Sequence, residues 1–203
     1  PGEAEPSFAV TIGDAALAGA SLKNLAVAAG LHRRTHLHAV GDGAPWIAEQ
    51  IEVQFGTQGN YLIDFYHLCD YLAAAAPVCA PSSSATWMEN QKARFKSGLI
   101  GEVVADLLSH AESEALPPEQ APVRRCLRYL TNRPGQFNYP EAIAANLPIG
   151  SGEVESAHRY VIQKRLKLPG AWWTIENAQA MLNLRTLRAN HLWSEYHGTS
   201  LSR

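Results

Sequence analysis

Two short strand-like segments, each followed by a helical segment, constrain the fold of this chain more than any other feature. Residues 36–40 alternate in polarity and end in a Gly-Asp-Gly turn, after which a proline fits the first turn of a helix over residues 45–55. A second strand is predicted over residues 60–68, and a helix over residues 68–76. Because this order is typical of parallel strands joined by crossover helices, the sequence predicts an α/β fold.

The middle of the chain lacks this alternation. A Pro/Ser-rich loop over residues 77–86 precedes a long amphipathic stretch at helical spacing, residues 87–115, and a further helix follows in VRRCLRYLTNR. We therefore predict an all-helical insertion over residues 77–147. It separates an α/β part, residues 1–76, from a group of C-terminal helices, residues 148–203.

Both flanking parts contain a helix with a clear boundary signal. Residues 7–30 look helical, with Gly30 as the C-cap, and Thr174 is a good N-cap for the last long helix. The residues of that last helix that are expected to face a core are Ile175, Ala178, Leu182 and Leu184.

Composition argues against several classes of protein. With 46% apolar residues the chain can bury a core, so disorder is not expected. The absence of a long apolar run argues against a membrane span, and the first residues carry no basic region typical of a signal peptide. Three cysteines without CxxC spacing, Cys69, Cys79 and Cys126, are interpreted as reduced thiols of a cytoplasmic protein.

Charge is divided unevenly along the chain. Residues 1–120 hold 6 Lys/Arg against 14 Asp/Glu, a balance of −8, whereas residues 121–203 hold 11 against 5, a balance of +6. Such a split suits a carboxylate site in one part and a polyanion-binding face in another, although ordinary solvated surfaces produce it too.

Asp42 is the first candidate ligand for a cation. It lies where the first strand ends, between the glycines of GDGA, and ligands bind at the carboxyl edge of a parallel sheet. The alternative is a turn aspartate whose side chain accepts hydrogen bonds from nearby backbone N–H groups.

The segment LPIGSGEVESAHRYVIQKRLK, residues 147–167, contains the second candidate. Its glycine turn leads into a helix that begins near Glu153, where the helix dipole favours an ionised carboxylate. Glu153 and Glu155 lie about 200° apart around the helix axis, so only one of them can point at a given site. The alternative is that both are first-turn acids that only complement the dipole.

Positive charge follows on the same helix. Arg159 lies one turn beyond Glu155, and Lys164, Arg165 and Lys167 come next. Carboxylates that hold cations, beside bases that hold phosphates, suit a phosphodiester substrate. A solvated amphipathic helix is the alternative.

Three blocks of sequence resemble successive motifs of bacterial insertion-sequence transposases, in particular the ISKra-type family of DDE transposases. The blocks are GDGAPWI, LIDFYHLCDYL and the long segment from YLTNRPGQF to LRTLRAN, and the match is collinear over residues 36–197. The specific part of the resemblance is the joint pattern of GDGA-WI, D-YH and IGSG-VES.

This resemblance implies a ribonuclease-H-like fold with a helical insertion before its last catalytic acid. In that family three acids, Asp, Asp and Glu, hold two divalent ions, Mg²⁺ or Mn²⁺. They serve DNA strand cleavage at transposon ends and transfer of the 3′ end into target DNA. Asp42 matches the second acid and Glu155 the third, as catalytic residues and metal ligands. His67, in the D-YH block with Asp64, is a further catalytic candidate, with structural hydrogen bonding as the alternative.

The chain departs from the family pattern at the first acid. The family's first aspartate lies on the opening strand, upstream of GDGA, and Asp14 has no comparable strand context. We therefore expect the carboxyl-terminal part of a catalytic domain that lacks its first three strands. A second copy or a partner chain is expected to cover the open strand edge, and the location is expected to be the cytoplasm, at the nucleoid.

Two rival functions and several side chains remain open. The rivals are a catalytically inactive DNA-binding or assembly remnant of a transposase, and a metal-dependent hydrolase of a small phosphorylated substrate. For Trp172 and Trp173 the alternative to DNA stacking is core packing. The residues expected to bind DNA are Arg159, Lys164, Arg165, Lys167 and Trp172. The side chains with weaker signals are His32, His36 and His38, which lack a partner at zinc-site spacing, and Arg124, Arg125, Arg128 and Arg133, which spread around their helix.

Overall fold

The computed structural model describes residues 5–200 and shows a mixed α/β protein that is mostly helical. Residues 1–4 and 201–203, at the ends of the two predicted flanking parts, lie outside the described residues. Its sheet has two parallel strands, so the predicted α/β class is confirmed at this level. No helix of the described part is long and apolar enough to cross a membrane.

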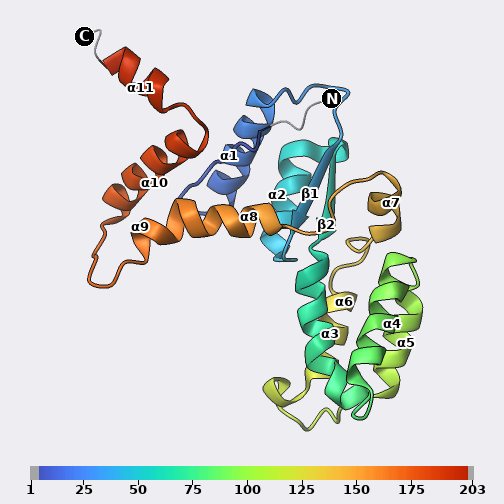
Figure 1. Cartoon of the computed structure of the whole chain (residues 1–203). Helices are drawn as coiled ribbons and strands as arrows, with labels where there is room; N and C mark the ends of the chain where they lie inside the picture. Colours follow the sequence, from blue (N-terminus) through green and yellow to red (C-terminus); the bar gives the residue numbers. More distant parts are fainter. Residues whose placement is uncertain (1–4, 201–203) are drawn as a thin grey trace. The chain divides into compact units, whose positions relative to one another are not determined.

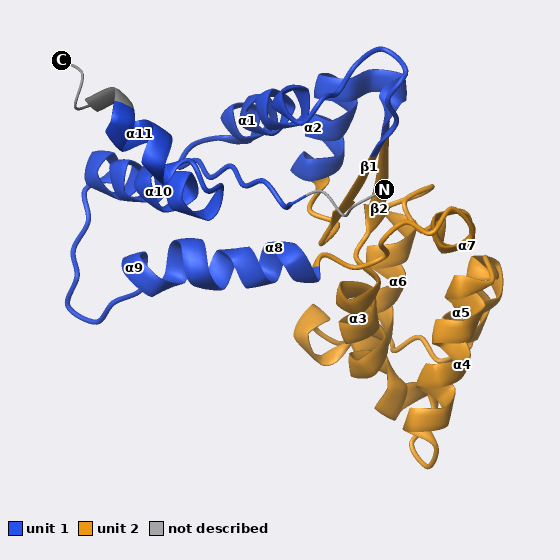
Figure 2. Ribbon diagram, turned by 45° about the horizontal axis from the view of Figure 1, so that its top comes forward, with its two compact units in different colours: residues 1–37, 46–59, 152–203 blue, residues 38–45, 60–151 orange. Residues whose placement is uncertain are grey.

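The chain forms two compact units, which Figure 2 colours separately. Unit 1 consists of residues 1–37, 46–59 and 152–203, and unit 2 of residues 38–45 and 60–151. Early in the chain the path passes from unit 1 to unit 2 at residue 38, back at residue 46 and again at residue 60. These crossings fall in the two strands and at the start of the helix between them.

The two strands lie where the sequence predicts them. β1 (Leu37–Gly41) and β2 (Gly59–Ile63) are neighbours, and α2 (Pro45–Phe55) with the 3-10 turn η1 (Gly56–Gln58) connects them. The second strand is shorter than predicted. It ends at Ile63 because Asp64 caps the helix that follows.

Unit 2 is otherwise helical. Its elements are α3 (Phe65–Cys79), α4 (Ser84–Lys96), α5 (Ile100–Ser109), η2 (Pro118–Gln120), α6 (Pro122–Thr131) and α7 (Tyr139–Ala144). Figure 1 shows α3 running beside α4 and α6, with which it packs. The core is aromatic: the rings of Phe65 and Phe95 both contact that of the fully buried Tyr139, with the Phe65 and Tyr139 centroids 5.2 Å apart.

The amphipathic stretch over residues 87–115 forms two helices instead of one. α4 ends at Lys96, where Leu99 N donates to Arg94 O and the backbone of Gly98 has a φ of +77°, which a helix cannot continue. The chain then turns into α5, so the apolar residues of both helices still reach the core of unit 2.

The three cysteines lie in unit 2 as free, buried thiols. Burial raises the pKa of Cys79 to about 11 and, together with the neighbouring Cys79, that of Cys126 to about 12. Both thiols are therefore protonated at neutral pH, and they serve as small apolar core residues.

Unit 1 contains the helices from both ends of the chain. Its elements, besides most of α2, are α1 (Ala15–Ala28), α8 (Gly152–Ala157), the π-helical segment η3 (His158–Gln163), α9 (Lys164–Leu166), α10 (Ile175–Ala189) and α11 (Trp193–Ser200). α1 begins later than predicted, at Ala15, because Asp14 Oδ1 accepts a hydrogen bond from Leu17 N and caps the helix there.

The segment before α1 is extended and is attached to α10 by side chains. Asn190 Oδ1 accepts from Phe8 N at 2.8 Å, and its amide nitrogen donates to Phe8 O at 2.9 Å. Gln179 binds Ile12 N in the same way, at 2.6 Å. These side chains make the hydrogen bonds to the backbone that a neighbouring strand would otherwise make.

Two of the four predicted core positions of α10 are buried. Thr174 caps this helix as predicted, and Ala178 and Leu182 face the core. Leu184 is partly exposed because it lies about 200° around the helix from Leu182. Ile175 is 74% exposed, since it is the first residue of the helix and lies outside the packed face.

Candidate functional site

Asp42 lies in the loop that follows β1, with its side chain exposed to solvent. Its Oδ1 accepts a hydrogen bond from Ala44 N at 2.9 Å, which is the local turn role considered above. Within residues 5–200, no group donates a hydrogen bond to the other oxygen, Oδ2. Asp42 can therefore shape the turn and still offer one carboxylate oxygen to a cation.

Three side chains from elsewhere in unit 2 hold the backbone of this loop. Tyr61 Oη accepts from Gly43 N at 2.9 Å, the Tyr129 hydroxyl donates to Asp42 O at 2.9 Å, and Arg133 Nε donates to Gly43 O at 2.6 Å. Burial raises the pKa of Tyr61 and that of Tyr129, so both phenols stay protonated at neutral pH. The loop is thus fixed by neutral phenols and one guanidinium group.

The same contacts explain why residue 43 is glycine. Gly43 has a φ of +83°, and a Cβ atom there would lie 2.6 Å from the Tyr129 hydroxyl and 2.9 Å from Arg133 Nε. We expect Gly43→Ala to lower the free energy of unfolding by ~2 kcal/mol, from backbone strain and crowding together. Urea denaturation would measure the change.

Gly135→Ala is the matched control for this prediction. Gly135 also lies in unit 2 with a positive φ, +76°, but nothing lies within 4 Å of its added Cβ. Gly135→Ala should lower the free energy of unfolding by ~1 kcal/mol, which is the contribution of backbone strain alone. Equal losses in the two variants would show that the tyrosine and arginine contacts do not crowd residue 43.

Asp64 is the most connected acid of unit 2 and is only 4% exposed. It caps α3, where its Oδ1 accepts from Tyr66 N at 2.7 Å and from His67 N at 3.2 Å. Its Oδ2 accepts from Ser151 N at 2.6 Å and from the Ser151 hydroxyl. Burial alone would raise the pKa of Asp64, but the Ser151 bonds and the two helix amides outweigh burial and hold it below its usual range.

Two of the sequence motifs, GDGA and D-YH, and the IGSG half of the third meet at this residue. Asp64 N donates to Gly41 O at 2.6 Å, which joins the D-YH block to the GDGA block at the end of β1. The bond from Ser151 to Asp64, and that from Phe65 N to Ile149 O at 2.8 Å, join the D-YH block to IGSG. Residues 87 positions apart in the sequence are therefore hydrogen-bonded in one cluster.

The first glycine of GSG has a packing role in this cluster. A Cβ atom on Gly150 would lie 2.7 Å from the ring of Tyr66, so only glycine lets the two motifs approach this closely.

His67 lies on the first turn of α3 and is partly buried. Its ring packs against those of Tyr71 and Tyr129, with centroids 5.6 Å and 6.0 Å away. Tyr129 also binds the Asp42 carbonyl, so one tyrosine contacts both His67 and the GDGA loop. A catalytic role for His67 stays a prediction.

Glu153 and Glu155 lie on the first turn of α8, in unit 1, and both are exposed. Glu153 lines an apolar hollow of about 400 Å³ together with Phe8 and Val154, whereas Glu155 is not part of that lining. The two carboxylates therefore have different surroundings, as their helical positions predict. Asp42 belongs to unit 2 and Glu155 to unit 1.

The five residues expected to bind DNA are all exposed in unit 1. Arg159 lies in the π-helical segment, Lys164 and Arg165 in α9, and Lys167 directly after it. Trp172, in the loop before α10, is 93% exposed, so the core-packing alternative does not hold for this side chain.

The arginines of the insertion have two different roles. Arg124, Arg125 and Arg128 line one small hollow of about 110 Å³ on α6, so they gather more closely than their spacing suggests. Arg133 instead binds Gly43 O and lies over the ring of Tyr129 at 4.1 Å. No local sequence signal points to this contact, because the two residues are 90 positions apart.

Metal ligation by Asp42 and Glu155 stays a prediction. Among residues 5–200, no three or more His, Cys, Asp or Glu side chains are grouped so that they could hold a metal ion. The ring nitrogens of two of the three clustered histidines have backbone partners: His32 Nδ1 accepts from Arg34 N, and His38 Nε2 bonds to Pro148 O. Asp42 and Glu155 remain as two exposed carboxylates of the type that hard cations prefer.

Comparison of the chain with protein-family models, with curated proteins and with solved structures gives no significant match.

Proposed function

We propose that this chain is part of the catalytic domain of a DDE transposase with a ribonuclease-H-like fold, which cleaves DNA strands at insertion-sequence ends and transfers them. The observation that carries the proposal is the hydrogen-bonded cluster around Asp64. It joins the GDGA motif, the D-YH motif and the IGSG half of the third motif at the carboxyl ends of β1 and β2. Ligands of open parallel sheets bind at this edge.

In this proposal Asp42 and Glu155 are the second and third acids, which would hold Mg²⁺ or Mn²⁺. Such ions, when bound, activate a water or a DNA 3′-hydroxyl and stabilise the leaving oxygen. What the chain contributes is rigidity at one ligand, because Tyr61, Tyr129 and Arg133 fix the backbone around Asp42. A ligand held in place loses less entropy on binding a cation.

The test of this function is a nicking assay on supercoiled DNA. We expect Mn²⁺ to produce nicked circles, and excess EDTA to prevent them. Small phosphoesters such as p-nitrophenyl phosphate should not be hydrolysed under the same conditions. Hydrolysis of the small ester without nicking would favour the rival phosphohydrolase.

A second candidate is a catalytically inactive DNA-binding or assembly remnant of a transposase. The observation in its favour is that Asp14 caps α1, through the hydrogen bond from Leu17 N to its carboxylate. It therefore lies at a helix terminus and not on a strand, where the first acid of the family lies. The remnant would bind DNA in the presence of EDTA and would nick none of it in the presence of Mn²⁺.

DNA binding itself should depend strongly on salt. We expect the triple variant of Lys164, Arg165 and Lys167 to glutamine to bind a DNA duplex more weakly. It should also reduce the slope of log Kd against log salt by about 2 to 3, because each lost phosphate contact removes about 0.9 from that slope. Fluorescence anisotropy over a salt series would measure this change.

The control for that variant neutralises three exposed cations elsewhere in unit 1, Lys23, Arg33 and Arg34. It removes the same charge and should leave the slope within about 1 of the parent value. If both triple variants lose slope equally, the effect is one of net charge, and the proposed face is wrong.

A further inference from the structure

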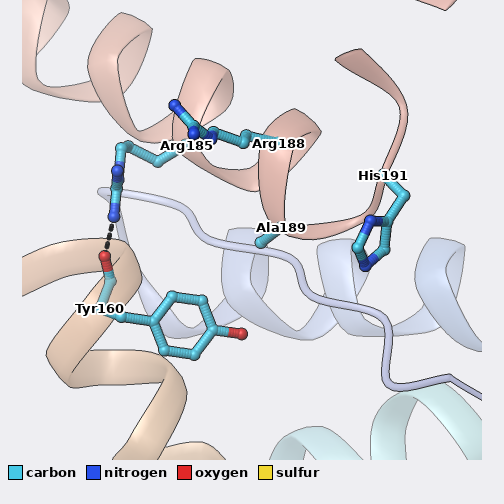
Figure 3. A pocket seen from close by; sticks show the side chains of 5 residues that line it. All are labelled: Tyr160, Arg185, Arg188, Ala189 and His191. Atoms are coloured by element: carbon cyan, nitrogen blue, oxygen red, sulfur yellow. Dashed lines mark hydrogen bonds between the residues drawn. The ribbon is translucent and has the colours of Figure 1, made fainter. Parts of the chain in front are cut away.

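A hollow with cationic walls lies in unit 1, apart from the acids discussed above. It encloses about 300 Å³ between the π-helical segment η3 and the end of α10. Figure 3 shows the rings of Tyr160 and His191 pointing toward the same space below Ala189. The residues that line it are Tyr160, Arg185, Arg188, Ala189 and His191, which include no acid.

Arg185 is held in place by the irregular helix opposite it. Its Nη2 donates to Tyr160 O and its Nε to Val161 O, the latter at 3.4 Å, as Figure 3 shows for Tyr160. The π-helical turn changes the backbone pairing here, and such turns are frequent at functional sites. Because these carbonyls take only part of its donor set, the guanidinium group is fixed and still has N–H groups free for a ligand.

The hollow contains two arginines whose charge no acid among the described residues neutralises through an ion pair. Arg188 lies three residues after Arg185, so the two side chains are neighbours on one helix face. Within residues 5–200 neither arginine forms an ion pair, since the carboxylate pairs are those of Lys92 and Arg94. Two adjacent cations without a counter-charge favour an anion between them.

His191 contributes a third polar side chain to the hollow, from the turn that ends α10. His191 follows α10 with a φ of +58°, a conformation that favours glycine and is uncommon for other residues. This conformation ends the helix, because Leu192 N donates to Leu187 O at 2.9 Å across the turn. Here the side chain is an imidazole that lines the hollow.

We propose that this pocket binds a phosphate group, through Arg185, Arg188 and His191, with the Tyr160 ring against the attached sugar or base. The planar fork of a guanidinium group matches two phosphate oxygens at once. A free nucleotide and the backbone of DNA share this chemistry. Binding here requires no divalent ion, so the pocket goes beyond the cutting function and is independent of it.

The experiment measures binding in EDTA with three probes: inorganic phosphate, AMP, and a short fluorescein-labelled single-stranded oligonucleotide. We expect Arg188→Gln to weaken the binding of every probe that binds by about tenfold, as for the loss of one charge-assisted hydrogen bond. Arg34→Gln removes an exposed arginine outside the pocket and should change affinity less than about twofold. His191→Asn keeps a residue that tolerates the left-handed conformation and should also weaken binding.

The outcomes separate the sources of the phosphate. Arg188-dependent binding of AMP identifies a nucleotide pocket, and Arg188-dependent binding of the oligonucleotide alone identifies a DNA backbone site. If none of the three probes binds in a way that depends on Arg188 and His191, or if Arg34→Gln weakens binding equally, the proposal is overturned. Because EDTA is present throughout, failure here leaves the Mn²⁺-dependent nicking result unaffected.

Discussion

Glu155→Gln is expected to abolish Mn²⁺-dependent nicking of DNA by this chain, a loss of at least about a hundredfold. The amide keeps the size of the side chain but removes the negative charge that holds a divalent cation. Without the bound metal, the transition state loses several kcal/mol of charge stabilisation. A time course of nicked circles from supercoiled plasmid, with and without Mn²⁺, would measure it.

Glu153→Gln is the matched control, because it changes the same chemical group two residues away. Glu153 lies about 200° around the helix and lines the apolar hollow beside Phe8 and Val154. This variant should retain most of the nicking rate. Both glutamates are exposed, so both variants should keep their stability within ~0.5 kcal/mol. Equal loss of nicking in the two variants would refute the assignment of Glu155.

Asp64→Asn should have the largest effect on stability, a loss of ~3 to 4 kcal/mol in the free energy of unfolding. The buried carboxylate accepts hydrogen bonds from Tyr66 N, His67 N and both donors of Ser151. An asparagine would turn an N–H group toward a donor and would leave at least one buried N–H without a partner. Asp70→Asn, an exposed acid on the same helix, should change stability by less than ~0.5 kcal/mol.

The effect of Asp64 should also depend on pH in a defined direction. Its folded-state pKa is lowered, so its stabilising contribution is fully present above the unfolded pKa of about 3.9 and is lost as pH falls through the lower folded value. The difference between the parent and Asp64→Asn should therefore shrink from about pH 6 to about pH 3 in urea denaturation. A difference that stays constant over this range would mean that the charge of Asp64 contributes nothing.

Local signals in the sequence predict much of this fold. The first strand, the helix after Pro45 and the cap at Thr174 all follow from neighbours in sequence, and the structure has them in place. The second strand shows the limit of such reasoning. Residues 64–68 are as apolar and aromatic as a strand, yet the side chain of Asp64 binds two backbone amides ahead of it and starts a helix.

The contacts that build the candidate site could not be predicted, because they join residues far apart in the chain. Nothing near Tyr129 or Arg133 indicates that they hold the loop after β1, and their partners are 87 and 90 positions away. Nothing near Ser151 indicates its bonds to Asp64. The blocks quoted for the resemblance are hydrogen-bonded to one another around Asp64, but nothing in their sequence indicates which atoms join them.

The Asp64 cluster also implies how this sequence can drift over time. Position 151 contributes a main-chain amide, which any residue but proline supplies, and a hydroxyl, which threonine would reproduce. Position 64 has no such substitute. Glutamate is one methylene longer, and asparagine would place an N–H donor where a carboxylate oxygen now accepts. Among diverged descendants of this chain, position 64 should therefore be the most invariant of the cluster, while position 151 alternates between serine and threonine.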